Sequence, residues 1–221
     1  MIKAVITADI VNSSALPGIK RQWLYEQIEY QLKQADSDFG MISEMYRGDS
    51  FQCLVTKAKN GLRSALVIKT FIRSLNIIEK PEDKLADIIS SSEIMDIRLG
   101  IGIGEIEERT GKIVTSDGKA FQLSGKLLDE MKNSRRRFGI ASDDAFMKEL
   151  KIESMLLDAI LSKTTSFQCE VINLKLLGYT ETEIARRLNI NQAAVNQRSV
   201  SGNWNAINKM VQYFENLYTN E

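Results

Sequence analysis

The chain has 221 residues, with 29 basic and 29 acidic side chains and no histidine. The balanced charge excludes recruitment of nucleic acid by an overall positive field, so any DNA contact has to come from a local patch. The absence of histidine excludes Ser-His-Asp and Cys-His catalysis and histidine-based zinc sites. Cys53 and Cys169 share no metal or redox spacing, and the apolar runs are too short for a membrane helix. We therefore expect a cytoplasmic protein with free thiols.

The first two thirds of the chain alternate short strands with amphipathic helices. The patterns predict a strand at 2–6, a helix at 20–35, a hairpin of 41–45 and 51–55, a helix at 62–75, a strand at 97–106, a helix at 120–131 and a strand at 138–141. A charged loop is expected around 79–87. This order predicts an α+β fold, a sandwich of the ferredoxin-like type.

Glycine alternates with isoleucine along the predicted strand 97–106. Alternation with a period of two indicates a strand whose glycine face lies against a helix or a ligand. The same glycines do not form a dinucleotide fingerprint, because they lie inside a strand and no helix begins after them.

The segment 143–161 has a helical pattern and contains neither glycine nor proline. We expect it to connect two modules as a stiff spacer. The predicted organisation is therefore an α+β domain at 1–142, a connecting helix at 143–163 and an all-α domain at 164–221.

The last segment carries the start and stop signals of consecutive short helices. Helix 167–177 stops at Gly178, a natural C-cap, and Thr180 with Glu183 forms a capping box that opens the next helix. Asn189 suits the left-handed residue of a tight turn, and Val195 supplies an apolar contact for a second helix. This pattern resembles the helix-turn-helix of sigma-factor region four. The alternative is a helical hairpin that only packs or dimerises.

The second of these helices is expected to enter the major groove of DNA. Amide and guanidinium side chains can pair with base edges there. The side chains expected to be exposed for this purpose are Gln192, Asn196, Gln197, Arg198 and Ser199, and those expected to contact phosphates are Arg186, Arg187 and Lys209. DNA is thus the predicted partner, and a protein such as a polymerase subunit is the alternative.

Two carboxylates of the first domain suggest a metal site. Asp9 follows the first strand and Asp49 lies in the hairpin turn, where the two could hold Mg²⁺ on a triphosphate. Backbone amides of 10–14 would then bind the phosphates. The alternative role for both carboxylates is turn capping.

Four segments extend this hypothesis: 8–14 (Ala-Asp-Ile-Val-Asn-Ser-Ser), 47–51 (Arg-Gly-Asp-Ser-Phe), 98–105 and 118–127. Their order resembles that of class III nucleotide cyclase domains over about residues 1–142. Together with the helix-turn-helix, the whole chain resembles the SatD family of bacterial proteins.

The cyclase resemblance implies roles for several residues. Asp9 and Asp49 match the two metal aspartates. Gln122 stands where the family has a ribose-orienting asparagine, and Lys126 where it has the arginine that stabilises the transition state. At the positions that select adenine, Met45 and Thr115 replace lysine and aspartate, and Ser50 replaces a glycine. An apolar Met45 cannot read a base edge, and Lys126 lacks the bidentate fork of arginine.

We therefore expect a DNA-binding transcriptional regulator with a diverged, non-catalytic cyclase-like domain that senses a ligand or dimerises. A homodimer is expected, because cyclase-like domains pair through their sheets and helix-turn-helix modules read two half-sites. The alternative is a metal-dependent enzyme that uses a nucleotide with Mg²⁺ and carries the helix-turn-helix as a targeting module. In that case Gln122 and Lys126 would be catalytic.

Overall fold

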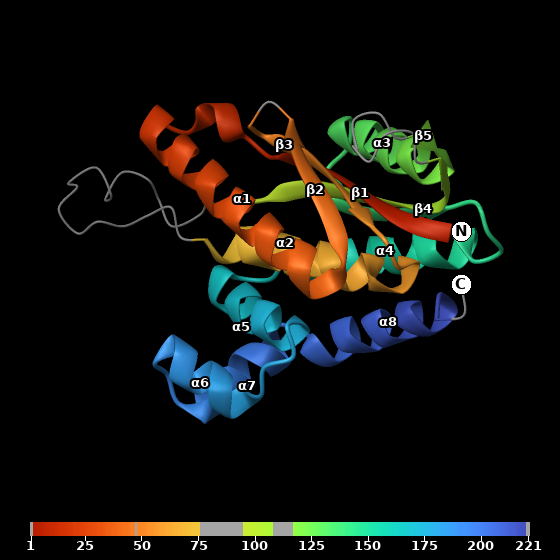
Figure 1. Cartoon of the computed structure of the whole chain (residues 1–221). Helices are drawn as coiled ribbons and strands as arrows, with labels where there is room; N and C mark the ends of the chain where they lie inside the picture. The colour runs from red at the N-terminus through yellow and green to blue at the C-terminus, as the bar shows by residue number, and fades with distance from the viewer. Residues whose placement is uncertain (1, 47, 76–94, 108–116, 220–221) are drawn as a thin grey trace.

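The computed structural model describes residues 2–46, 48–75, 95–107 and 117–219 (Figure 1). Thr115, Arg47 and the loop expected around 79–87 lie outside the described residues. The elements of the sheet and its helices are β1 (Ile2–Ile10), η1 (Ser13–Ala15), α1 (Gly18–Phe39), β2 (Met41–Tyr46), β3 (Ser50–Val55), η2 (Ala58–Asn60), α2 (Gly61–Ser74), β4 (Ile97–Glu107), β5 (Asp117–Gly118), α3 (Lys119–Lys132) and β6 (Phe138–Ser142). The helices that follow are α4 (Met147–Ser162), α5 (Ser166–Leu176), α6 (Glu181–Leu188), α7 (Gln192–Ser201) and α8 (Trp204–Leu217).

The sheet is mixed but mainly antiparallel. Its order is β2-β3-β1-β4, each neighbour antiparallel, and β4 also pairs with β5 and, in parallel, with β6. The expected hairpin is confirmed by the pairing of β2 with β3. The expected combination of a sheet with flanking helices is confirmed as well. Strand β1 extends to Ile10, past the predicted end, because it is paired on both sides.

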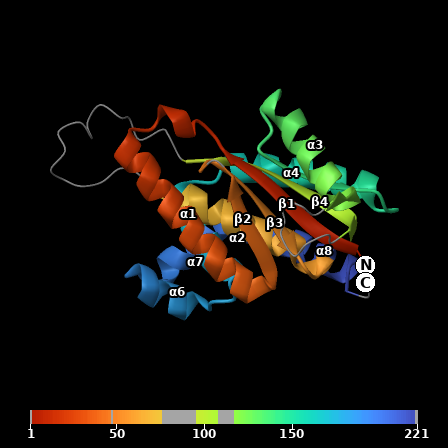
Figure 2. The ribbon, with the colours of Figure 1, turned by 45° about the horizontal axis from the view of Figure 1, so that its top comes forward.

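The two faces of the sheet pack against different helices. Ala4, Ile6 and Ala8 point into the main hydrophobic cluster, which α1, α2 and α4 complete. The alternate residues of β1 face α3, which lies over β4 and β1 (Figure 2). The β2–β3 half of that face carries no described helix, and Ile42 of β2 is 47% exposed there.

The glycine face of β4 receives α3, as its pattern predicted. A Cβ at Gly100 would lie 3.0 Å from the carbonyl oxygen of Ser124. At Gly102 it would lie 2.6 Å from the amide nitrogen of Ser124 and would collide with the carbonyl oxygen of Ala120. Real Cβ atoms do not approach backbone so closely, so only glycine lets the helix reach the strand.

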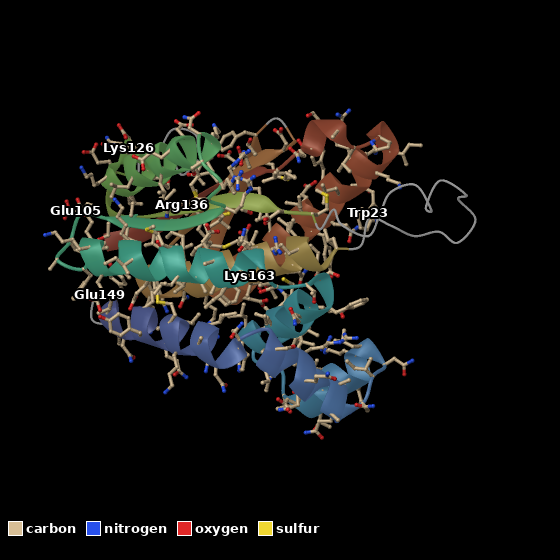
Figure 3. All side chains as sticks on the ribbon, turned by 180° about the vertical axis from the view of Figure 1, so that it is seen from behind. Trp23, Glu105, Lys126, Arg136, Glu149 and Lys163 are labelled. Carbon is tan, nitrogen blue, oxygen red and sulfur yellow. The ribbon has the colours of Figure 1, made fainter. Side chains whose placement is uncertain are left out.

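Helix α4 is part of the core, which corrects the expectation of a stiff spacer. Leu157 of α4, Ile172 of α5 and Phe214 of α8 belong to the same buried cluster as Ile6 of β1. Figure 3 shows α4, whose ends are marked by Glu149 and Lys163, between the sheet and α8. A helix with one apolar face buries it where neighbouring apolar surface exists, and here β6 and the main hydrophobic cluster provide that surface.

Polar contacts also join α2 to the last helices. Arg63 of α2 forms an ion pair with Glu215 of α8, with Nε 2.6 Å from Oε1. The Asn173 amide of α5 donates to the carbonyl of Val67 at 2.7 Å.

Cys53 and Cys169 are buried free thiols. Among the described helices, none has the length and apolar character that crossing a membrane requires.

A buried ionic cluster lies at the start of β4. The Lys69 ammonium, 1% exposed, donates to Asp96 Oδ1 at 2.9 Å and to the carbonyl of Ile97 at 2.9 Å. Arg73 contacts the other Asp96 oxygen at 2.7 Å and donates to the carbonyl of Thr164 at 2.9 Å. The Asp96 carboxylate therefore neutralises two cations of α2, one of which also holds the beginning of α5.

Replacing Gly102 with alanine should lower the free energy of unfolding by about 3 kcal/mol, because the methyl group overpacks against the α3 backbone. Gly125→Ala is the matched control, since a Cβ there meets nothing within 4 Å. Alanine in a helix is favoured over glycine by up to ~1 kcal/mol, so this control should be neutral or stabilising. Urea denaturation measures both, and equal effects of the two changes would contradict the packing of α3.

Asp96→Asn should lower the free energy of unfolding by about 3–5 kcal/mol, because it removes the carboxylate that contacts two buried cations. Glu29→Gln is the control, because its ion pair with Lys33 spans 2.9 Å between side chains that are 57% and 69% exposed. Exposed pairs contribute about 0–1 kcal/mol. An Asp96→Asn variant that unfolds at the wild-type urea concentration would show that the cluster does not stabilise the fold.

Candidate functional site

Asp9 lies on the α3-facing side of the central strand. It is paired in register with Ser50 of β3 and with Arg98 of β4. Arg98 Nη1 donates to both Asp9 oxygens, at 2.9 Å and 2.8 Å. The two side chains are 14% and 19% exposed. A mostly buried carboxylate thus has a cation from the same sheet as its partner.

Asp49 lies at the same corner of the sheet. Its backbone carbonyl accepts from the Ile10 amide at 2.9 Å, which holds the β2–β3 turn against the end of β1. Gly48 before it has a positive φ of 77°, which glycine adopts readily. The Asp49 carboxylate accepts from the Ser13 hydroxyl at 3.2 Å and from the Ser50 hydroxyl at 3.4 Å. The structure therefore brings both predicted carboxylates to one corner and gives them different partners.

The expected phosphate cradle at 10–14 is wrong for its first two amides. The Ile10 amide donates to Asp49, and the Val11 amide donates to the carbonyl of Asp96 at 2.9 Å. These N–H groups are used because β1 continues further than the sequence pattern indicated. Asn12 then turns the chain with φ 57° into η1.

The donor set of the corner does not fit a divalent ion. Both Asp9 oxygens face a guanidinium, and Arg98 Nε is buried without a hydrogen-bond partner among the described residues. An orphaned N–H requires an acceptor and cannot ligate a metal. No group of three or more acidic, cysteine or histidine side chains suited to a metal occurs in the described ranges. Mg²⁺ is commonly held by one or two carboxylates together with substrate phosphates, and here only Asp49 lacks a cationic partner in the described contacts.

A row of hydrogen bonds crosses the same face of the sheet. Tyr46 donates to Gln52 at 3.3 Å, Gln52 donates to Thr7 at 3.0 Å, and the hydroxyls of Thr7 and Ser124 are 2.8 Å apart. Burial raises the pKa of the Tyr46 hydroxyl, which therefore stays protonated as a donor. The sequence analysis missed this row, although the alternation of polar residues in the strands was the signal for it.

The positions predicted to act in catalysis do not meet Asp9 within one chain. Gln122 and Lys126 are exposed, and they lie two residues on either side of Ser124, which faces the sheet. Two residues correspond to about 200° around a helix, so both face away from the sheet. Figure 3 shows Lys126 on the outer side of α3. Met45 packs against the main hydrophobic cluster, on the opposite face of the sheet from Asp9.

The caps predicted for the C-terminal helices are confirmed. Thr180 and Glu183 form a reciprocal capping box, and these hydrogen bonds lower the pKa of the Glu183 carboxyl. Asn189 has φ 51° and ψ 45°, the left-handed conformation expected between α6 and α7. Asn191 caps α7 by accepting from the Ala194 amide at 2.7 Å. Ile184 and Val195 pack in a small buried cluster that joins α6 and α7 to α5.

The surface of α7 differs from the prediction at two positions. Gln192, Asn196 and Gln197 are exposed as expected, but Ser199 is buried. Arg198 is 26% exposed, because it contacts Glu170 Oε2 at 3.3 Å and lies 4.9 Å from the Phe167 ring centre. It therefore faces α5 and is only partly exposed. Its position on α7, directly before buried Ser199, accounts for this orientation.

The three predicted phosphate contacts are not on one surface. Arg186 and Arg187 are exposed on α6, and the Arg187 guanidinium lies over the Tyr179 ring at 4.0 Å. Lys209, in contrast, lines a groove of about 470 Å³ between α4 and α8, together with Glu153 and Met210. The sequence between 184 and 214 contains no acidic residue, but Glu181 is close, since hydrogen bonds from Lys175, Asn196 and Gln192 lower the pKa of its carboxyl.

No family model and no curated protein matches the chain. Solved structures do. A bacterial light-regulated adenylyl cyclase is similar at 17% identity over 68% of this chain and 79% of that chain, with a TM-score of 0.48. The guanylyl cyclase domain of the RhoGC fusion protein from the aquatic fungus Blastocladiella emersonii is 14% identical over 57% and 71%, with a TM-score of 0.43. The adenylyl cyclase CyaB from P. aeruginosa is 16% identical over 59% and 73%, with a TM-score of 0.40.

Proposed function

We propose that this protein binds DNA through α7 and regulates transcription. The observation that carries the proposal is the exposed face of α7, where Gln192, Asn196 and Gln197 lie within about 140° of each other around the helix. Side-chain amides in this position can donate to and accept from one base edge, and adenine is their usual partner. The capping box of α6 and the left-handed Asn189 support a helix-turn-helix, because they fix the angle at which α7 follows α6.

The acidic side chains near α7 limit the electrostatic attraction between this surface and DNA. Arg186 and Arg187 are the exposed cations of α6, and Glu183 in the same helix lies close enough for both to lower its pKa. Gln192 and Asn196 lie close enough to Glu181 to lower the pKa of its carboxyl, and this interaction must be given up or shared when α7 meets bases. Few phosphate contacts imply that the affinity depends on base contacts more than on the salt concentration.

We further propose that the protein acts as a homodimer and that domain 1–142 is a cyclase-like, ferredoxin-like module without catalysis. The β2–β3 half of the α3-facing side of the sheet carries no helix among the described residues, and the exposed Ile42 on it supports pairing of two copies through their sheets. In this arrangement 143–163 is the connecting helix and 164–221 the DNA-binding domain. Arg98 pairs with Asp9, and the Lys126 side chain points away from the sheet. Both features support a sensing or dimerising role over catalysis. The SatD resemblance is part of this proposal.

Asn196→Ala should weaken binding to the preferred site by ~1–3 kcal/mol and relax sequence preference, because it removes a base contact. Arg186→Ala should weaken all sequences alike and reduce the salt dependence by about one unit, because it removes a phosphate contact. Selection of bound genomic fragments, followed by gel shift at several salt concentrations, measures both effects.

The matched control is Asn205→Ala, which removes an exposed asparagine from α8 and should leave binding unchanged. Retention of no DNA at ~100 mM salt would refute the proposal. Unchanged binding of Asn196→Ala to its selected site would refute the assignment of α7. Metal-dependent turnover of a nucleoside triphosphate by the purified protein would instead support the enzyme hypothesis.

A further inference from the structure

The carboxylate that the cyclase resemblance assigns to a metal already has a cation of the chain itself. Arg98 stands directly opposite Asp9 across the β1–β4 pair, and one of its nitrogens reaches both carboxylate oxygens. Directly opposed residues of neighbouring antiparallel strands have Cβ atoms about 5 Å apart, so the backbone itself keeps this pair together. The contact does not depend on a mobile loop.

We propose that Arg98 takes the place of a divalent ion at this corner, so that the site is independent of metal. To bind an ion between Asp9 and Asp49, the protein would have to withdraw a guanidinium from a carboxylate when both are more than four-fifths buried. Separating a buried pair leaves each charge uncompensated, which is strongly unfavourable. The displaced arginine would also remain next to the incoming cation and repel it.

The surroundings give Arg98 little room to turn away. Its Nε is buried, and the neighbouring Ile97 carbonyl is held by the ammonium of Lys69 at 2.9 Å. The Asp96 carbonyl accepts from Val11 of the segment that follows β1. Residues next to the pair in both strands are thus fixed by hydrogen bonds. The corner presents a guanidinium and the hydroxyls of Ser13 and Ser50 beside the carboxylate of Asp49, which has no cationic partner among the described residues.

The ion pair and the metal site predict opposite effects of the same substitution. If Asp9 neutralises Arg98, then Asp9→Asn leaves a buried cation without its partner and destabilises the protein. If Asp9 and Asp49 are instead two like charges that await an ion, Asp9→Asn relieves their repulsion and stabilises the protein without metal. The sign of the change separates the two arrangements without any assay of activity.

The first experiment is thermal unfolding of the full chain in the presence of a chelator. Asp9→Asn should lower Tm by roughly 5–10 °C, as expected for loss of a buried partner in a chain of this size. Asp49→Asn is the matched control and should change Tm little, because among the described residues the Asp49 carboxylate accepts from the Ser13 and Ser50 hydroxyls and contacts no cation. An unchanged or raised Tm for Asp9→Asn would overturn the proposal.

The second experiment is titration with Mn²⁺ alone, followed by electron paramagnetic resonance of the unbound ion. The wild-type protein should show no binding that depends on Asp9 and Asp49. Arg98→Ala should gain a Mn²⁺ site whose Kd is at least about tenfold lower than that of any binding to the wild-type protein. Adding Asp49→Asn to Arg98→Ala should abolish this site. Arg98→Lys keeps the positive charge and should gain nothing.

Wild-type binding of Mn²⁺ that is lost in Asp9→Asn would overturn the proposal. A folded Arg98→Ala protein that gains no site would do so as well, because Arg98 would then not be what excludes the ion. The measurements are independent of DNA binding, so failure of this inference leaves the proposed function untouched.

Discussion

The ion cluster around Asp96 is the interaction on which the rest of the structure depends. Burial lowers the pKa of the Lys69 ammonium, and the adjacent Asp96 carboxylate opposes this shift. The same carboxylate binds Arg73, whose other nitrogen reaches the carbonyl of Thr164. A single acidic side chain at the start of β4 therefore neutralises two cations of α2, and one of these holds the first turn of the C-terminal helices. Removing one partner from such a cluster leaves the remaining charges buried and uncompensated. This cost in free energy is the reason why the cluster constrains the fold so strongly.

This constraint connects the two ends of the molecule. Asp96 is two residues from Arg98, so the anchor of β4 also fixes the residue that binds Asp9. On the other side, Asn173 holds α5 to α2, Arg73 holds the residue before the N-cap of α5, and Arg63 holds α8. Because α6 and α7 pack on α5, the exposed face of α7 has a defined direction relative to the sheet (Figure 1). The shared core therefore holds the exposed face of α7 in a fixed orientation to the sheet.

The environments of the predicted site residues differ from those that their spacing suggested. Asp9 has the guanidinium of Arg98 as its partner. The Ile10 and Val11 amides keep their place and are used by the backbone. Gln122 and Lys126 keep their spacing and face away from the sheet that carries Asp9. Residue type and spacing describe what a site could contain, whereas its chemistry depends on which charges and hydrogen bonds surround each group.

The sequence by itself determined the local features of this protein. The glycine face of β4, the capping box of Thr180 and the left-handed Asn189 were predictable, because each depends on residues a few positions apart and on backbone sterics. Only the tertiary structure decided which charges meet. Arg98 and Asp9 are 89 residues apart, and Arg198 and Glu170 are 28 apart, so no local pattern reveals either pair. The burial of α4 likewise followed from an apolar surface that β6 and the main hydrophobic cluster form only after folding. Long-range pairing fixes the surroundings of a side chain, and those surroundings made Arg198 a structural contact and Asp9 the partner of an arginine.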